Sequence, residues 1–349
     1  MSADKTIRET GERELIELLS PYVQCGRGGH WSVGVGDDAA VSSSKATGKK
    51  QVVTTDLLIE ETHFLRNADT PWFWLGRKAA TANLSDIAAM GAWPTGMVVS
   101  VGLPPEMRVG DLLELYRGIH YLSLQEFGAP IIGGDTTRSG ALMISITCFG
   151  EKTFSQAECL RSDARPGDYV YVTDTLGASR MGLEFILDPG LTAQIPPEMA
   201  EWPFLNQPPA NYHYMMSPRC EMGVAISRAL SRVGMLDVSD GLYNELHLMA
   251  EASGVGLDID LNSVPVHLAA EAFCDWRGID AHEYALFSGE EYELLFACEA
   301  SPDEVEEAVF RFTVPEPIYC LGRVTESREV RFLRDGVEFV PSNATFRHF

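Results

Sequence analysis

The sequence lacks the features of several common protein classes. Its 7 cysteines among 349 residues are odd in number, scattered and never two or three apart, so we expect neither a disulfide framework nor a zinc knuckle. No apolar run approaches the roughly 20 residues that a membrane-spanning helix needs, and the first residues contain no apolar signal region. We therefore expect a cytoplasmic protein whose thiols stay reduced.

Basic residues are also scarce. The chain has 27 Lys and Arg against 50 Asp and Glu, a net charge of −23, and it contains no Lys/Arg-rich block. Nucleic acid and anionic membranes are therefore not expected partners. The acidic excess is explained most simply by solubility, but an acidic protein that binds phosphates also needs metal ions to mediate the contact.

Familiar catalytic signatures are missing too. Gly48 precedes two lysines, but no glycine stands five residues before it and no Ser or Thr follows, so this is not a Walker A motif. We find no protein-kinase catalytic loop, no nucleophile-elbow serine and no Cys/His pair of catalytic type. Isolated aspartates beside hydroxyls and glycines are what the sequence offers for chemistry.

The length and the 45% hydrophobic content predict a globular α/β protein of about two domains. A polar turn-rich stretch near 150–166 marks the seam, so we expect an N-terminal domain over residues 1–150 and a C-terminal α/β domain over 151–349. Predicted strands and helices alternate in the first half, starting with a helix over 12–19. The candidate acids are expected at the ends of these elements. Residues 188–216 are expected to form a long loop, to which we assign no role.

The most informative stretch lies within residues 71–92, where apolar residues recur at spacings of three and four and predict a buried helix. Asp86 sits among small residues near its end, where a carboxylate is costly unless a cation meets it. Five other aspartates stand in apolar or Gly-rich settings: Asp38, Asp56, Asp135, Asp237 and Asp240. We expect all six to meet and hold divalent cations against nucleotide phosphates, although Asp240 taken alone is more simply a helix N-cap.

Such a set of acids suits phosphoryl transfer, which depends mainly on positioning and charge neutralisation. Mg²⁺ keeps several waters and takes only one or two protein carboxylates, so several ions would need about this many scattered acids. An acceptor that is itself a phosphate needs no strong general base, and we expect no discrete catalytic base. Arg161 is a candidate cation for the phosphates, and the Gly133-Gly134 backbone a candidate for close approach to phosphate oxygens.

Eight motifs occur in the order found in the thiamine-monophosphate kinase family, which the chain resembles from about Gly11 to its C-terminus. They are Gly34-Val35-Gly36-Asp37-Asp38, Thr54-Thr55-Asp56, His63-Phe64, Asn83-Leu84-Ser85-Asp86-Ile87-Ala88-Ala89-Met90-Gly91-Ala92, Ile132-Gly133-Gly134-Asp135-Thr136-Thr137, Pro166-Gly167-Asp168, Asp237-Val238-Ser239-Asp240-Gly241-Leu242 and Ser288-Gly289-Glu290-Glu291-Tyr292-Glu293-Leu294. That family is similar to aminoimidazole ribonucleotide synthetase, selenophosphate synthetase and a hydrogenase-maturation protein. The resemblance implies a two-domain α/β (α+β) architecture like that of the synthetase, with an N-terminal sheet domain that forms a homodimer and ATP bound between the domains.

The resemblance also implies roles for single residues. The implied magnesium ligands are Asp38, Thr54, Thr55, Asp56, Asp86, Asp135, Asp237 and Asp240. The implied ATP contacts are Gly134, Asp135, Arg161 and Ser239. The implied contacts to the thiamine moiety are His63, Glu290 and Phe346. Taken without the resemblance, His63 is an ordinary loop histidine and Phe346 a packed tail residue. Thr54 replaces the family's usual serine, and Phe346 stands where Tyr or Trp is frequent.

The implied activity is ATP-dependent phosphorylation of thiamine monophosphate to thiamine diphosphate, the last step of thiamine diphosphate biosynthesis, by direct in-line transfer in a multi-magnesium site. Two alternatives stay open. A sister synthetase such as aminoimidazole ribonucleotide synthetase would release orthophosphate, and a non-catalytic nucleotide-binding protein would bind ATP and Mg²⁺ without turnover.

Overall fold

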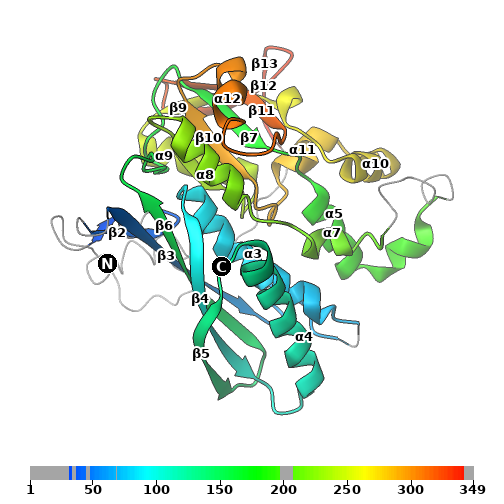
Figure 1. Cartoon of the computed structure of the whole chain (residues 1–349). Helices are drawn as coiled ribbons and strands as arrows, with labels where there is room; N and C mark the ends of the chain where they lie inside the picture. The colour runs from blue at the N-terminus through cyan, green and yellow to red at the C-terminus, as the bar shows by residue number, and fades with distance from the viewer. Residues whose placement is uncertain (1–30, 34–36, 45–47, 68, 197–206, 342–349) are drawn as a thin grey trace, which may run out of the picture.

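Two mixed β-sheets organise the chain (Figure 1). The computed structural model describes residues 31–341, apart from 34–36, 45–47, 68 and 197–206. The predicted helix over 12–19 and Phe346 therefore lie outside the described residues. In the described part of the chain, no helix is long and apolar enough to cross a membrane.

The first sheet and its helices come from the N-terminal half. The elements are β1 (Trp31–Val33), β2 (Ala40–Ser44), β3 (Lys49–Ile59), α3 (Trp72–Ala89), β4 (Trp93–Leu103), α4 (Val109–His120), β5 (Ile131–Arg138) and β6 (Met143–Thr153). The described strands run in the order β1-β2-β3-β6-β4-β5. Neighbours are antiparallel except β4 and β5, which are parallel. On β3, Val52, Thr54 and Leu58 are buried and alternate with more exposed residues, because successive strand residues face opposite sides of a sheet.

The second sheet and its helices come from the C-terminal half. The elements are β7 (Tyr169–Thr173), α5 (Ala178–Leu187), α7 (Asn211–Tyr214), α8 (Cys220–Ala229), β8 (Gly234–Asp237), α9 (Leu242–Ser253), β9 (Gly256–Asp260), α10 (Leu268–Arg277), α11 (Ala281–Leu286), β10 (Leu294–Cys298), α12 (Pro302–Val309), β11 (Ile318–Thr325), β12 (Val330–Arg334) and β13 (Val337–Phe339). The strand order is β13-β12-β9-β11-β7-β10-β8. Asp335-Gly336, a pair that is typical of hairpin turns in the sequence, joins β12 to β13, which form an antiparallel pair.

Helix α3 lies between the two halves. It packs on β3, β4 and β6 of the first sheet and on α7, α8 and β8 of the second half, and Figure 1 shows it in this central position. The sequence predicted one apolar face, but polar residues on other faces are buried as well, among them Arg77, Lys78 and Asn83. A helix covered on several sides can keep polar side chains only where they find partners, and several of those partners build the site described below.

The positions of two acids differ from the prediction. Asp56 and Asp135 were expected at the ends of strands but lie inside β3 and β5. The segment predicted as a loop over 188–216 contains a 3₁₀ turn, Pro189–Gln194, and the short helix α7. This helix brings His213 into the interior, where only 3% of its surface is exposed.

Candidate active site

Three aspartates from distant parts of the chain meet where the two halves join. Asp38 stands just before β2, Asp86 near the end of α3 and Asp237 at the end of β8. One carboxylate oxygen from each lies within 4.8 Å of those of the other two. We call these three residues the acid cluster.

The acid cluster is electrostatically costly without a cation. Burial and then the charges of Asp56, Asp237 and Asp38 raise the pKa of Asp86 well above its usual value. Burial, followed by the charge of Asp38, raises the pKa of Asp237 to about 8. Arg161 reaches the cluster, with Nη2 2.6 Å from Asp38 Oδ1, but the other oxygen of Asp38 is buried without a hydrogen-bond partner. Carboxylate oxygens crowded in this way fit divalent cations such as Mg²⁺.

Neighbouring polar side chains orient these acids. Thr54 Oγ1 donates to Asp86 Oδ2 at 2.5 Å, and Ser85 Oγ donates to Asp237 Oδ2 at 2.6 Å. Because Thr54 is on β3, Ser85 on α3 and Asp237 on β8, these bonds join both halves of the molecule at the cluster. Ser85 was not singled out from the sequence.

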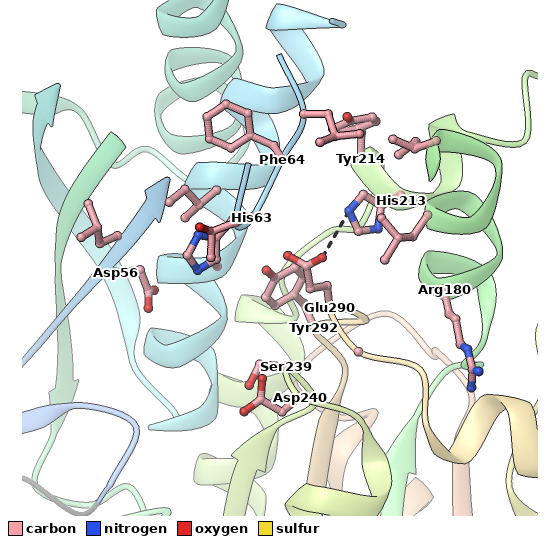
Figure 2. A pocket seen from close by; sticks show the side chains of 18 of the residues that line it. Asp56, His63, Phe64, Arg180, His213, Tyr214, Ser239, Asp240, Glu290 and Tyr292 are labelled. Carbon is pink, nitrogen blue, oxygen red and sulfur yellow. Dashed lines mark ion pairs between the residues drawn. The ribbon is translucent and has the colours of Figure 1, made fainter. Parts of the chain in front are cut away.

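A cavity of about 550 Å³ adjoins the cluster. Asp56, Asp86, Asp237, Ser239 and Asp240 line it, and burial raises the pKa of Asp56 to about 6. Figure 2 shows Ser239 and Asp240 on one side of the cavity and Phe64 and Tyr214 on another. Its remaining lining is mainly apolar and includes Leu58, Leu183, Ile186 and Phe287. The cavity thus combines an acidic region with an apolar region that suits a ring.

The turn before β10 directs each of its glutamates to a different place. Glu290 lines the cavity. Glu291 Oε1 accepts from the backbone N–H of Gly177, 2.7 Å away, at the start of α5, and Glu293 pairs with Arg219. Glu290 and Tyr292 both have a φ of 56°, a left-handed conformation that non-glycine residues adopt at a cost. That backbone path is what turns Glu290 into the cavity while its neighbour points back to α5.

Glu245 is a further buried acid that the sequence reasoning missed. It lies on α9 and is 3% exposed. Its Oε1 accepts from the backbone N–H of Asp240 at 3.0 Å and from Ser239 Oγ at 3.4 Å. Glu245 therefore fixes the loop that carries two of the predicted ligand contacts. Its position four residues after Gly241, in the first turn of a helix, was the available signal.

Most of the predicted site residues lie at the cavity or at the acid cluster. Those that line the cavity or touch the acid cluster are Asp38, Thr54, Asp56, His63, Asp86, Arg161, Asp237, Ser239, Asp240 and Glu290. His63 Nδ1 accepts from the backbone N–H of Ile59 at 3.0 Å. Thr55 is exposed on β3, and its hydroxyl donates to the carbonyl of Ile146 at 2.9 Å.

The structure does not bring Asp135 to the acid cluster. Two strands, β6 and β4, separate its strand from β3. The cross-strand register runs Leu57–Ser145–Ser100–Asp135, so Asp135 lies roughly 14 Å from Leu57. Directly paired residues share a face, which puts Asp135 on the face opposite Asp56. Gly134, beside it, approaches the carbonyl of Val99 so closely that a Cβ would lie 1.8 Å from that oxygen.

Comparison with known proteins gives the fold a class. The family model of the AIR synthase related protein N-terminal domain matches residues 36–151, and that of the C-terminal domain matches residues 165–334. The chain is thus a two-domain protein of the AIR synthase related class, with an α/β architecture.

Whole-chain similarity is more specific. The chain is 32% identical to the thiamine-monophosphate kinase of Synechococcus elongatus over 99% of each chain, and 34% identical to that of Bacillus subtilis over 75% of this chain and 76% of the relative. A solved structure of AaThiL complexed with AMPPCP and TMP superimposes with a TM-score of 0.80 at 29% identity, over 100% of both chains. The chain belongs to the thiamine-monophosphate kinase family.

Proposed function

We propose that this protein transfers the terminal phosphate of ATP to thiamine monophosphate and forms thiamine diphosphate. Family membership supports the reaction class, and a similar structure is complexed with AMPPCP and TMP. The observation that carries the proposal is the acid cluster, whose three carboxylates lie within 4.8 Å of one another beside a cavity of about 550 Å³ with a largely apolar wall. A phosphate donor and a ring-bearing acceptor need these two environments side by side.

The chain's own residues have separate tasks in this proposal. Asp38, Asp86 and Asp237 would hold Mg²⁺, together with Asp56 and Asp240 at the edge of the cavity. Bound magnesium supplies neutralisation of the negative charge on the two phosphates. Arg161 adds a fixed guanidinium, and Ser239 a hydroxyl for the nucleotide. The acceptor phosphate is largely dianionic near neutral pH, so no side chain has to remove a proton from it.

The remaining assignments are proposals of the same kind. His63 and Glu290 line the cavity where a thiamine ring would lie. We assign Thr54 to the metal site through its bond to Asp86. Thr55, Gly134 and Asp135 lie away from the cavity, and their proposed metal and nucleotide contacts rest on the family resemblance, as does that of Phe346.

We also propose a homodimer formed through the N-terminal sheet. Ile132 is 62% exposed on β5, so an apolar side chain on this sheet is open to a second copy. A cytoplasmic location is consistent with the free thiols of six described cysteines.

One assay tests the proposed reaction. Purified protein is incubated with ATP, Mg²⁺ and thiamine monophosphate, and the products are separated by chromatography. Thiamine diphosphate and ADP in equal amounts are the expected result. Release of orthophosphate without thiamine diphosphate would instead indicate a synthetase-type ATPase, and no consumption of ATP would indicate a binding protein.

A further inference from the structure

A buried Lys–His pair stands behind Glu290 at the wall of the cavity. Lys78 comes from α3, His213 from α7 and Glu290 from the turn before β10. The side chains of Lys78 and His213 are 1% and 3% exposed, whereas that of Glu290 is 31% exposed. Figure 2 shows His213 beside Glu290. The three residues therefore form a contact that is buried at the back and open toward the cavity.

Lys78 uses its full hydrogen-bonding capacity in this contact. Its Nζ lies 2.8 Å from Glu290 Oε1 and 2.9 Å from Oε2, 2.7 Å from His213 Nε2 and 3.2 Å from the carbonyl oxygen of His63. An ammonium group has three hydrogens. Here it faces three acceptors: a carboxylate, an imidazole nitrogen and a carbonyl. The lysine is thus held at a fixed point and holds Glu290 in turn.

These distances also define the state of His213. Since Lys78 donates to Nε2, that nitrogen accepts and the imidazole is neutral, with its proton on Nδ1, which lies 3.3 Å from the carbonyl oxygen of Ser179. Burial, and then the charge of Lys78, lower the pKa of His213 to about 4, which agrees with a neutral ring. The 3.2 Å approach between Nε2 and Glu290 Oε2 is then bridged by the ammonium and is not an ion pair.

We propose that Lys78 and His213 are positioning residues for the substrate, which lock the carboxylate of Glu290 in the orientation that accepts a hydrogen bond from an N–H donor on a substrate ring in the cavity. The inference rests on the proposed function and adds to it. In this proposal α7 has a structural role, because its residue His213 keeps Lys78 directed toward Glu290. Although burial acts against it, the Lys78 charge keeps the pKa of Glu290 below its usual value, so the acceptor is ionised.

A second buried lysine, Lys152, has a purely structural role and serves for comparison with Lys78. Lys152 is 2% exposed, and its Nζ donates to the carbonyl oxygens of Met90, Ala157 and Glu158. It thereby satisfies backbone groups just after α3 and in the segment between β6 and β7, and it does not line the cavity. Lys78 instead donates a hydrogen bond to the carboxylate of Glu290, which faces the cavity. Lys152→Met is therefore a matched control for Lys78→Met.

The test compares steady-state kinetics of the full-length variants with Mg²⁺ present. His213→Leu and Lys78→Met should raise KM for thiamine monophosphate about tenfold, equivalent to ~1.4 kcal/mol, and leave KM for ATP within about twofold. His213→Gln, whose amide oxygen can accept from Lys78, should restore most of the affinity. Lys152→Met should lower the thermal midpoint without a selective change in KM.

The outcomes separate the inference from the function on which it rests. If the wild type forms no thiamine diphosphate, the proposed function fails and the inference fails with it. If the wild type is active but His213→Leu keeps a normal KM for thiamine monophosphate, only the inference is overturned. Equal rises in both KM values, or no rescue by His213→Gln, also overturn it. His213→Leu keeps Lys78 as the counter-charge of Glu290, so this variant decides the matter even if Lys78→Met does not fold.

Discussion

At the scale of single residues, Asp86 is held by a short hydrogen bond and surrounded by other carboxylates. It accepts from Thr54 at 2.5 Å, and burial followed by three neighbouring carboxylates raises its pKa well above the usual value. Carboxylates that repel one another in a buried place destabilise the fold unless a ligand compensates. The carboxylate of Asp86 therefore lowers the stability of the metal-free fold, although the proposed activity requires it.

Asp86→Asn should raise the thermal midpoint of the metal-free protein and abolish turnover. The amide keeps the shape of the side chain but removes one charge from the cluster, which should stabilise the fold by about 1 kcal/mol or more. The same loss of charge weakens the binding of divalent cations, so kcat should fall at least ~10²-fold. Thermal unfolding in a chelator and the chromatographic assay measure the two effects.

Asp69→Asn is the control, because Asp69 is exposed and outside the cavity. It should change neither the midpoint nor kcat. An Asp86→Asn protein that turns over near the wild-type rate would remove the basis for a metal role of the cluster, and a lower midpoint would contradict the repulsion argument.

The residue scale also shows how far sequence reasoning reaches. Apolar or Gly-rich flanks mark the acids of the cluster, because a carboxylate in such a setting needs a partner. The same logic applies to Lys78 within the apolar stretch of α3, where the signal was present but not used. The partner of Lys78 could not be predicted from the sequence, because Glu290 is 212 residues away in the chain and only the tertiary fold brings the two together.

At the scale of elements, α3 and α4 cross at unusually close range. A Cβ on Gly76 would lie 2.0 Å from the carbonyl oxygen of Leu115, and one on Gly118 would lie 1.8 Å from that of Phe73. Each helix therefore uses a glycine where the backbone of the other passes. This contact fixes α3, which carries both Lys78 and Asp86, against the first half of the molecule.

Gly118→Ala should destabilise the protein by roughly 1–3 kcal/mol or more, because the methyl group has to push the two helices apart. Gly110→Ala in the same helix is the matched control, since a Cβ added at Gly110 would have nothing within 4 Å. There alanine should be neutral or stabilising by up to about 1 kcal/mol through its helix propensity. Denaturant unfolding of both variants measures the difference. Similar effects at the two positions would disprove the close crossing.

Elements with a strong period were the most predictable. The helix predicted over 71–92 is α3, Trp72–Ala89, and the Asp335-Gly336 turn correctly indicated a hairpin. Gly133-Gly134 was singled out for close approach to phosphate oxygens, and both glycines lie inside β5. The second glycine is needed for the approach to Val99, and sequence alone does not distinguish that use from approach to a ligand. The parallel pairing of β12 with β9 likewise depends on tertiary packing.

At the scale of the whole molecule, the site depends on both halves at once. Asp38 and Asp86 belong to the first half and Asp237 to the second, while hydrogen bonds such as Ser85 to Asp237 cross between them. The free energy of the acid cluster is therefore part of the free energy that holds the halves together. Protonation and metal binding should both be visible in global unfolding.

The metal-free protein should lose stability as the pH rises from about 5 to about 8.5. The pKa values of Asp56 and Asp237 are raised to about 6 and about 8 in the folded protein, whereas an unfolded aspartate titrates near ~3.9. The folded state thus binds more protons over this range, and the stabilisation present at low pH is lost as the pH passes the folded pKa values. Thermal midpoints measured in a chelator at constant ionic strength test the sign.

Mg²⁺ should raise the midpoint and flatten most of this pH dependence, because a bound cation keeps the cluster ionised at every pH in the range. Part of the slope should persist, since burial also raises the pKa values of Glu291 and Glu293 to about 8 and about 7, and neither residue lines the cavity. Asp237→Asn should show a smaller slope than the wild type in chelator and a weaker response to Mg²⁺. Identical slopes with and without Mg²⁺ in the wild type would mean that divalent cations do not bind at the acid cluster.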